Sequence, residues 1–462
     1  MTKAICCKNT EKEVDKDNIW SDDLFERQKV ANNFTKIIES IEQPYVLSIN
    51  SRYGSGKTFF LKRWAEDLKQ KGEHVIFFNA WNCDFIEKPL IPFLYNFILQ
   101  LKEQNLIKYG IQEDLKNCKE VFCIAVKEII EKYSGLNVDI LNDHKNPDTL
   151  KLPTIRTLTD YQELENILDN FKKGLFEITS KLNGKNIYVF VDELERCRPT
   201  FAIELLEAIK HLFGVKGLVF VLGIDREQLK HTISNIYGCG MDGEGYLRRF
   251  IDLELELPQP DIKKFTKYLQ KSFEIVNEDN HKGSLTCGYD MFDTFFNLFA
   301  LIYPMQLRDV EQIYAKFNVI TKMFDENTNK IMPILAILLV LKTKDKSLYN
   351  QFTSENLSYK NIEMFLDKNI IQKLNDYNVF GKKQLLEQFK FTCMLFSNED
   401  YKKILEKMYS EYSNSDINNI PQEIKDKMKA YKRVAESQNY YECFEVNYIE
   451  YLKNMISYIK SE

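Results

Sequence analysis

The sequence of 462 residues lacks the features that mark several common classes of protein. Its ten cysteines include no C-x-x-C pair, and its five histidines are not spaced from one another as metal ligands are. No signal peptide is recognisable at the N-terminus. We therefore expect free thiols in a cytoplasmic protein, and neither a disulfide framework nor a structural zinc site.

Long apolar runs are also missing. The most apolar run, residues 331–341, stops at Lys342 after about half the length that a helix needs to cross a bilayer. Two further runs, 89–101 and 121–130, are also too short, and polar or charged residues interrupt them. These segments predict helices of a protein core and no membrane insertion.

A strong excess of positive charge is absent too. The net charge of −5 and the pI near 5.8 argue against a globally basic nucleic-acid-binding protein. A basic groove on one face would not alter these totals, so nucleic-acid binding stays open. With 44% apolar and 28% charged residues, the chain predicts two or three folded domains rather than a disordered protein.

One strong positive pattern occupies residues 45–61. An apolar run ends at Asn50, the sequence Gly54-Ser-Gly-Lys-Thr58 follows, and helical spacing then resumes. A buried strand that leads into a glycine-rich loop and a helix N-terminus is typical of a phosphate-binding loop. Lys57 can then reach the phosphates, and the Thr58 hydroxyl can ligate Mg²⁺. The predicted nucleotide-binding residues are Tyr53, Gly54, Ser55, Gly56, Lys57, Thr58 and Phe59.

One residue departs from the P-loop pattern G-x-x-x-x-G-K-[ST]. The pattern begins with glycine where this chain has Ser51. Serine tolerates a positive φ less well than glycine does. We therefore expect Ser51 to affect nucleotide affinity rather than the fold.

An acidic strand, which a P-loop ATPase also needs, occurs at residues 186–196. The apolar residues 187–191 predict a strand buried on both faces, and Asp192 and Glu193 follow at its carboxyl end. We expect Asp192 to hold Mg²⁺ through water and Glu193 to orient or deprotonate the attacking water. The alternative interpretation is a strand followed by a solvated acidic turn.

A third apolar run, residues 216–224, predicts a strand that ends at the same sheet edge with Asp225. Asp225 either hydrogen-bonds the attacking water or the γ-phosphate, or it caps the next helix. Proteins that read guanine usually carry Asn/Thr-Lys-x-Asp on such a strand. The corresponding residues here are Gly-Ile-Asp-Arg, so the sequence favours ATP over GTP.

Five stretches carry a family resemblance: Asp22-Asp-Leu-Phe-Glu-Arg-Gln-Lys-Val-Ala31, Tyr53-Gly-Ser-Gly-Lys-Thr58, Phe77-Phe-Asn-Ala-Trp81, Asp192-Glu-Leu-Glu-Arg-Cys197 and Phe220-Val-Leu-Gly-Ile-Asp-Arg-Glu227. Together they resemble the KAP family of P-loop NTPases, in the additional-strand, catalytic-acid group that includes the AAA+ and STAND proteins. The resemblance covers about residues 20–320. Glu193 and Glu195 stand where the family usually has Asp, and the longer side chain of Glu193 suits a catalytic base at least as well.

Arginines near the predicted site are candidates for contact with the γ-phosphate. The resemblance to AAA+-like lids implies that Arg308, at a predicted helix start, senses the nucleotide; otherwise it is a surface residue. Arg196 follows the acidic strand closely, and in assembled relatives an arginine at this level can enter a neighbour's site. Arg248 and Arg249 compete for this role or are solvated helix charges.

Composition shifts along the chain predict its organisation. We expect a flexible tail (1–21), an NTPase domain (22–256) with a helical insertion at about 84–186, a helical lid (257–344) and a C-terminal helical domain (345–462). The predicted fold class is therefore α/β, a parallel-sheet P-loop NTPase core followed by all-α parts. The lid phenylalanines from 265 to 299 are expected to be core residues, and Cys197 is expected to pack behind the acidic strand.

These interpretations give one primary hypothesis and two alternatives. The chain is predicted to be a cytoplasmic ATPase, with ATP and Mg²⁺ as cofactors, whose hydrolysis drives a conformational or assembly switch. Its expected partners are further copies of itself or an effector protein. The alternatives are a nucleotide-loaded signalling scaffold with little turnover and a motor acting on DNA. Resemblance to soluble bacterial family members implies a role in defence against phage or mobile elements, which no residue here demonstrates.

Overall fold

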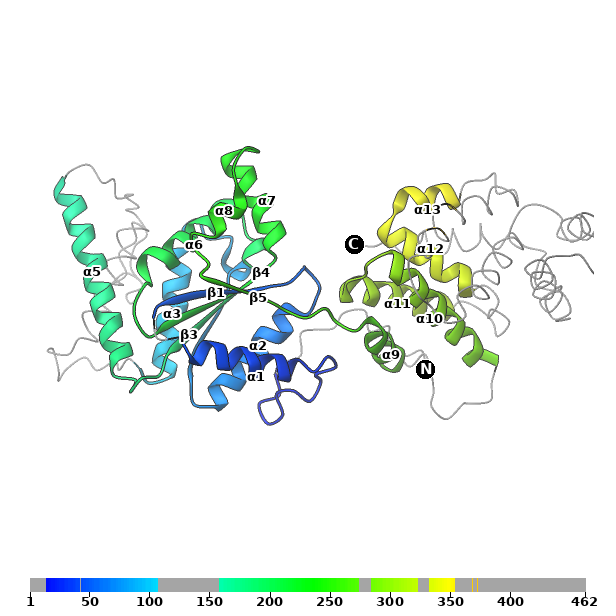
Figure 1. The fold of residues 1–462 in the computed structure, drawn as a ribbon, viewed down its shortest axis with the longest axis horizontal. Coiled ribbons are helices and arrows are strands. Elements are labelled where there is room, and N and C mark those ends of the chain that lie inside the picture. Colours follow the sequence, from blue (N-terminus) through cyan, green and yellow to red (C-terminus); the bar gives the residue numbers. More distant parts are fainter. Residues whose placement is uncertain are drawn as a thin grey trace, which may run out of the picture. The chain divides into compact units, whose positions relative to one another are not determined.

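The computed structural model describes residues 14–41, 43–106, 158–273, 284–322 and 332–353, with the isolated positions 368 and 372. The described residues fall into two compact units, which divide between Gln259 and Pro260 (Figure 1). Residues 107–157 of the predicted insertion and nearly all of the predicted C-terminal domain lie outside the described ranges.

The first unit is built on a five-stranded parallel sheet. Its strands are β1 (Tyr45–Asn50), β2 (His74–Asn79), β3 (Ile187–Asp192), β4 (Leu218–Ile224) and β5 (Leu253–Glu256). They lie in the order β2-β3-β4-β1-β5, and every neighbouring pair is parallel. The strands expected at the phosphate loop, the acidic turn and Asp225 all form, so the predicted α/β class is confirmed. The short β5 was not identified from the sequence.

Helices cover both faces of this sheet (Figure 1). One face packs against α1 (Arg27–Glu39) and α2 (Lys57–Gln70), and the other against α3 (Leu90–Glu103), α5 (Leu158–Ser180) and α6 (Pro199–Leu212). Every residue of β3 and β4 is buried, as two-sided coverage of central parallel strands requires. After β4 the chain forms α7 (Arg226–Tyr237) and α8 (Gly243–Leu247) before it returns to the sheet as β5.

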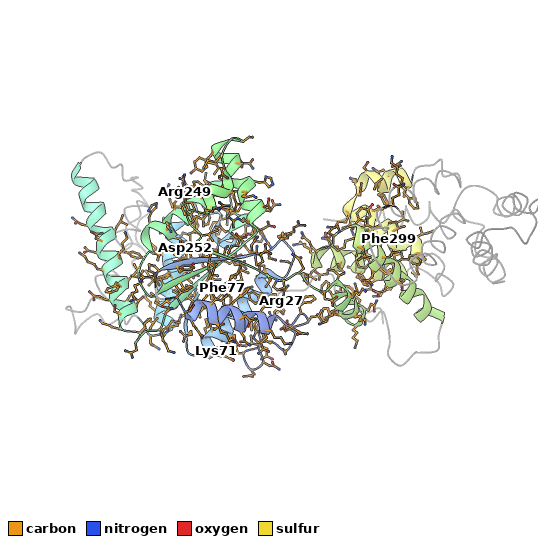
Figure 2. The ribbon with its side chains drawn as sticks, viewed as in Figure 1. Arg27, Lys71, Phe77, Arg249, Asp252 and Phe299 are labelled. Carbon is orange, nitrogen blue, oxygen red and sulfur yellow. The ribbon has the colours of Figure 1, made fainter. Side chains whose placement is uncertain are left out.

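Aromatic side chains fill the layers on the two faces. Phe190 of β3 meets Trp64 of α2 edge to face, with ring centroids 5.2 Å apart, and stacks on Phe77 of β2 at 6.2 Å. Phe77 is labelled in Figure 2. On the other face, Phe220 of β4 contacts Phe93 of α3 at 6.4 Å. Successive side chains of a strand point to opposite faces of the sheet, so the apolar strands supply both layers with apolar side chains.

A close approach occurs at Gly223 of β4. In the sheet register Gly223 lies opposite Ile49 of β1 on one side and Asp192 of β3 on the other. A Cβ atom at this position would come within 2.2 Å of Leu61 Cδ1 and 2.9 Å of Asp192 Oδ1. The missing side chain leaves room for helix α2 and for the carboxyl group at the end of β3.

The chain packs onto the first unit before residue 22, where the predicted tail was expected to end. Ile19 is buried, and the rings of Trp20 and Phe60 lie 6.4 Å apart. Arg63 of α2 binds both carboxylate oxygens of Asp22, at 2.6–3.0 Å. Residues 1–13 of the predicted tail lie outside the described ranges.

The second unit is helical in its described part. It contains α9 (Ile262–Ser272), α10 (Ser284–Ile302), α11 (Leu307–Thr321), α12 (Met332–Lys344) and α13 (Lys346–Phe352). Phe292, Phe295, Phe296 and Phe299 of α10 are buried in its core, while Phe265 and Phe273 pack at the core's edge, which confirms the predicted role of these phenylalanines. Phe299 is labelled in Figure 2.

Helix α12 contains the most apolar run of the sequence. All ten residues from Met332 to Leu341 are buried against the rest of the second unit, so the prediction of a core helix is confirmed. Among the helices in the described ranges, none combines the length and apolarity that crossing a membrane requires.

Candidate nucleotide-binding site

The loop between β1 and α2 has the backbone of a phosphate-binding loop. Gly54 and Gly56 adopt left-handed conformations, with φ of 81° and 89°. Gly56 directly precedes α2, so the unpaired N–H groups of the helix N-terminus face the concave side of the loop. Both glycines are needed for this path, because a side chain would disfavour positive φ.

Ser51 does not carry the penalty predicted for it. The non-glycine residues with positive φ in the described ranges are Glu26, Asn105, Asn183 and Glu193, so Ser51 is outside the left-handed region. Its N–H donates to the Ile224 carbonyl at 3.1 Å, and its hydroxyl contacts that of Ser55. The expected conformational cost was wrong, because the loop turns at Gly54 and Gly56 instead.

Asp225 anchors the loop from the end of β4. Its Oδ2 accepts from the Tyr53 N–H at 2.9 Å, and its Oδ1 accepts from the Gln228 N–H at 3.3 Å. The second contact caps α7, as one of the two interpretations predicted. Both carboxylate oxygens therefore hold backbone N–H groups, while a contact of Asp225 with substrate stays a prediction.

Lys57 is bound to Glu195, a contact that was not predicted from the sequence. Its ammonium donates to Glu195 Oε1 at 2.7 Å and to the Ser51 carbonyl at 3.4 Å. The side chains of Lys57 and Glu195 are only 6% and 4% exposed. Glu195 thus brings a third carboxylate to the acidic end of β3, beside Asp192 and Glu193.

Asp192 is fully buried at the end of β3. Burial raises the pKa of its carboxyl group to about 6, although the Thr58 hydroxyl and Lys57 act in the opposite direction. Oδ1 accepts from the Glu193 N–H at 2.9 Å, whereas Oδ2 is buried without a hydrogen-bond partner among the described residues. Asp192 therefore combines a buried oxygen that no described residue binds with a carboxyl group that interacts with the Thr58 hydroxyl, and carboxylate and hydroxyl oxygens are ligands that Mg²⁺ prefers.

Glu193 adopts a strained backbone conformation, with φ of 61° and ψ of 29°. Its Oε2 accepts from Asn79 Nδ2 at 3.1 Å, and its Oε1 pairs with Arg196 at 2.8 Å. Asn79 ends β2, so the neighbouring strand fixes the orientation of the predicted catalytic carboxylate. The one sign of this contact in the sequence is the polar residue that follows the apolar part of β2.

Arg196 ends the short 3-10 helix η3 (Leu194–Arg196). Besides Glu193, its guanidinium lies 4.6 Å from the ring centre of Tyr53 and 5.1 Å from that of Trp81, which begins η1 (Trp81–Cys83). The side chain thus serves the site of its own chain. Action on a neighbouring chain stays a prediction.

Other predicted residues have different environments. Phe59 places its ring 3.5 Å from the Arg63 guanidinium, and its contact with a nucleotide stays a prediction. Cys197 packs in the core as predicted, and burial raises the pKa of its thiol. Arg308 is the second residue of α11 in the other unit, so its role as a nucleotide sensor stays a prediction.

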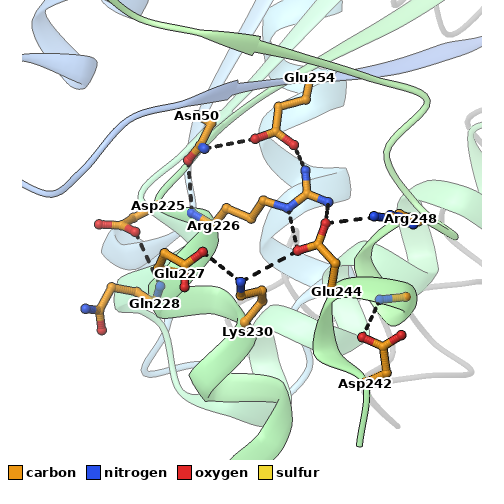
Figure 3. A network of polar contacts seen from close by, with 11 residues as sticks. Asn50, Asp225, Arg226, Glu227, Gln228, Lys230, Asp242, Glu244, Arg248 and Glu254 are labelled. Atoms are coloured by element: carbon orange, nitrogen blue, oxygen red, sulfur yellow. Dashed lines mark hydrogen bonds and ion pairs between the residues drawn. The ribbon is translucent and has the colours of Figure 1, made fainter. Parts of the chain in front are cut away.

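A polar network supports the loop from the side of β5 (Figure 3). Arg226 pairs with Glu244 of α8 and with Glu254 of β5, and its Nε lies 3.1 Å from Glu244 Oε2. Asn50, the last residue of β1, donates to Glu254 Oε1 at 2.9 Å and accepts from the Arg226 N–H at 3.2 Å. The network joins the strand that precedes the phosphate loop to α7, α8 and β5.

The competing arginines lie at the margin of this network. Arg248 is 73% exposed and lies 3.6 Å from Glu244, while Arg249 lies over the ring of Tyr246 at 5.7 Å. Together, the predicted residues Lys57, Thr58, Asp192 and Glu193 converge at the carboxyl edge of the sheet. This is where ligands bind in open α/β sheets.

Several solved structures are similar to this chain, all at low scores. The Aeropyrum pernix ORC2 protein in ADPNP–ADP complexes is 15% identical, with 89% of this chain and 94% of that chain covered and a TM-score of 0.33. Drosophila ORC bound to GC-rich DNA and Cdc6 is 11% identical, with 94% of this chain and 59% of that chain covered and a TM-score of 0.33. AMPPCP-bound DnaA from Aquifex aeolicus is 13% identical, with 88% of this chain and 93% of that chain covered and a TM-score of 0.26. Similarity at this level carries no argument about ligands or partners.

The sequence matches a family model described as the KAP family P-loop domain, over residues 27–324. Comparison with curated protein sequences gives no match. The family match spans more than half of the chain and includes the phosphate loop, the acidic strand and β4. The chain therefore belongs to the KAP family of P-loop NTPases.

Proposed function

We propose that the protein binds Mg·ATP at the phosphate loop and hydrolyses it to drive a conformational or assembly switch. The observation that carries this proposal is the convergence of Lys57 and Thr58 with Asp192 and Glu193 at one sheet edge. Asp192 Oδ2 is buried and lacks a hydrogen-bond partner in the described part of the chain, which suits a cation. Membership of a P-loop NTPase family supports the same conclusion.

The residues have distinct roles in this proposal. The N–H groups of the loop and of the first turn of α2 bind the phosphates, and Lys57 neutralises charge on the β- and γ-phosphates. Thr58 and Asp192 would hold Mg²⁺, which neutralises charge developing on the phosphate oxygens when bound. Asp225 keeps the loop in place through the Tyr53 N–H.

Glu193 orients the attacking water and accepts its proton. Its two oxygens are bound to Asn79 and Arg196, so one of these contacts must open before the carboxylate can accept a hydrogen bond from water. Arg196 is then a positioning residue for Glu193, and Arg308 of the second unit reads the γ-phosphate. The nucleotide state would thereby set the geometry of the lid.

A nucleotide-loaded scaffold with little turnover is the second candidate. Two contacts favour it: Lys57 is engaged by Glu195, and both oxygens of Glu193 are engaged by protein groups. For the cellular role, we propose a cytoplasmic switch in defence against phage or mobile elements, acting through self-assembly or an effector protein. This role rests on family resemblance alone.

Turnover distinguishes the two candidates. Phosphate release would be measured with ATP and Mg²⁺ for the wild type, Glu193→Gln and Lys57→Ala. We expect Glu193→Gln to retain ATP and to hydrolyse it about 100-fold more slowly or worse, as loss of a general base does. Lys57→Ala should neither bind nor hydrolyse. Wild-type turnover no faster than that of Glu193→Gln would favour the scaffold, and a Glu193→Gln variant with full activity would exclude Glu193 as the base.

A further inference from the structure

The pair formed by Lys57 and Glu195 points beyond hydrolysis itself. The Lys57 ammonium donates to Glu195 Oε1 at 2.7 Å, and both side chains are almost completely buried. An ammonium group has three N–H donors and one charge to offer. In this arrangement the carboxylate of Glu195 already takes one donor and balances the charge.

Glu195 depends on Lys57 for its pairing. Its second oxygen, Oε2, is buried and has no hydrogen-bond partner in the described ranges. Its neighbours on η3 are engaged elsewhere, since Arg196 pairs with Glu193. Among the described residues, the Glu195 carboxylate can therefore turn away from Lys57 without breaking another hydrogen bond or ion pair of its own.

A nucleotide phosphate and the Glu195 carboxylate carry the same sign of charge. Both would lie within contact distance of one ammonium, in a buried place where like charges repel more strongly than in water. Asp192 and Glu193 add further negative charge along the same turn. The gain from binding a phosphate to Lys57 is thus reduced by the loss of its existing partner.

We propose that Glu195 is a built-in competitor for Lys57, so that it sets the affinity of the site for nucleotide. ATP binds Lys57 only by displacing the carboxylate of Glu195, and the Glu195 side chain then rotates away from the Lys57 ammonium. This rests on the proposed function, because it requires that ATP binds at the phosphate loop. Glu195 is on this view a residue that tunes affinity and takes no part in the chemical step.

A structural role for the pair predicts the opposite result. Loss of one partner from a buried ion pair usually destabilises a protein, and a loosened phosphate loop binds its ligand more weakly. Loss of a competitor tightens binding instead. The sign of the affinity change therefore separates the two roles.

The test is isothermal titration of the 462-residue chain with ATP in EDTA, which keeps metal binding by the carboxylates out of the measurement. Glu195→Gln is compared with the wild type and with Glu193→Gln as a matched control. Both variants remove one negative charge from the same turn at nearly constant size, but Glu193 contacts Asn79 and Arg196 rather than Lys57. We expect Glu195→Gln to bind ATP about tenfold more tightly, equal to about 1.4 kcal/mol, and Glu193→Gln to change affinity less than about twofold.

Three results would overturn the proposal: unchanged affinity in Glu195→Gln, weaker affinity, or equal tightening in both variants. Thermal unfolding without nucleotide establishes that each variant is folded, and Glu195→Ala is the substitute if the glutamine variant is not. A wild type that binds ATP, together with a Glu195→Gln that binds no better, refutes only the role of Glu195. A wild type that binds no ATP, with or without Mg²⁺, refutes the proposed function as well.

Discussion

The two sides of the phosphate loop differ in how completely their polar groups are paired. At the ends of β4 and β5, both oxygens of Asp225 accept backbone N–H groups, and Arg226 binds two carboxylates. None of the residues in this network contributes to the buried side-chain atoms that lack a hydrogen-bond partner within the described chain. Paired groups of this kind fix the positions of the strands and helices that carry them.

The acidic side is different. In the described ranges, three buried atoms of the turn from Asp192 to Arg196 have no hydrogen-bond partner, namely Asp192 Oδ2, Glu195 Oε2 and Arg196 Nε. Glu193, in the same turn, has a left-handed backbone. Each buried unpaired group costs about 1–3 kcal/mol, and strain adds to this. The comparison indicates a stable frame on one side and, on the other, groups whose missing partners a ligand would supply.

The largest expected effect is at Lys57, which faces the acidic side from the loop. Lys57→Ala should lower ATP affinity about a thousandfold, or about 4 kcal/mol, because the charge that neutralises the phosphates is lost. Isothermal titration measures the affinity, and circular dichroism checks the fold. Lys69→Ala on the same helix is the control, since Lys69 is 39% exposed and lies 3.7 Å from Glu66. Unchanged affinity in a folded Lys57→Ala would remove the phosphate-loop assignment.

Arg226→Met removes the central cation of the polar network beside β5. The change leaves Glu244 and Glu254 without their shared cation, and we expect it to lower the free energy of unfolding by about 2–3 kcal/mol. Arg248→Met removes another cation near Glu244 but from a side chain that is 73% exposed, against 13% for Arg226. The control should change stability by less than about 0.5 kcal/mol. Urea unfolding measures both, and equal effects would contradict the role assigned to the network.

Asp192→Asn sharpens the comparison on the acidic side. Burial raises the pKa of Asp192 from its ordinary 3.8 to about 6. The folded carboxyl therefore keeps its proton to a higher pH than the unfolded one, so the stability of the wild type falls as the pH rises from about 4 to about 6. Without nucleotide, the asparagine variant should be more stable at pH 7 by about 1–3 kcal/mol and lack this slope.

Urea unfolding at about pH 4.5, below the pKa of the folded Asp192 carboxyl, and at about pH 7, above it, measures the difference in stability. Titration with Mg·ATP should show weaker binding by the same variant, since the proposed metal ligand is lost. Equal stability of wild type and variant at pH 7 would show that the buried carboxylate costs the folded chain nothing.

The smallest expected effect on stability is at Arg196. Contacts of its guanidinium with Tyr53 and Trp81 are partly exposed, so Arg196→Ala should cost less than about 1 kcal/mol in thermal unfolding. Because Arg196 holds Glu193 of its own chain, hydrolysis per chain should fall equally at all protein concentrations. A mixture of Arg196→Ala with Glu193→Gln should hydrolyse no more ATP than the two variants do separately. Recovery of activity in the mixture would instead establish action on a neighbouring chain.

Contiguous patterns explain what could be predicted from the sequence. The strands β1, β3 and β4 follow from apolar runs, and the residues after them lie at one edge because the sheet is parallel. Lys57, Thr58, Asp192 and Glu193 were found in this way. The glycines of the loop were also recognised from local sequence, since left-handed backbone has few other solutions.

Contacts between distant residues could not be predicted. Glu195 meets Lys57 across 138 positions, and Asn79 meets Glu193 across 114, and both depend on side-chain rotamers at the ends of strands. Among the arginines, nothing in the sequence separated the largely buried Arg226 from the exposed Arg248. The penalty expected at Ser51 failed for a related reason, because a pattern gives spacing and not the φ angle at each position.

Gly223 bears on how mutational tolerance would be interpreted in this family member. A methyl group there would meet Leu61 and Asp192 at once, so even alanine has to push the loop-bearing helix and the acidic strand apart. In a saturation screen for activity, position 223 should therefore reject substitutions as strongly as Lys57 does, although no atom of Gly223 needs to touch a nucleotide. Intolerance at this position would report a required spacing between two elements, and only a binding assay on folded variants would distinguish it from intolerance at a contact residue.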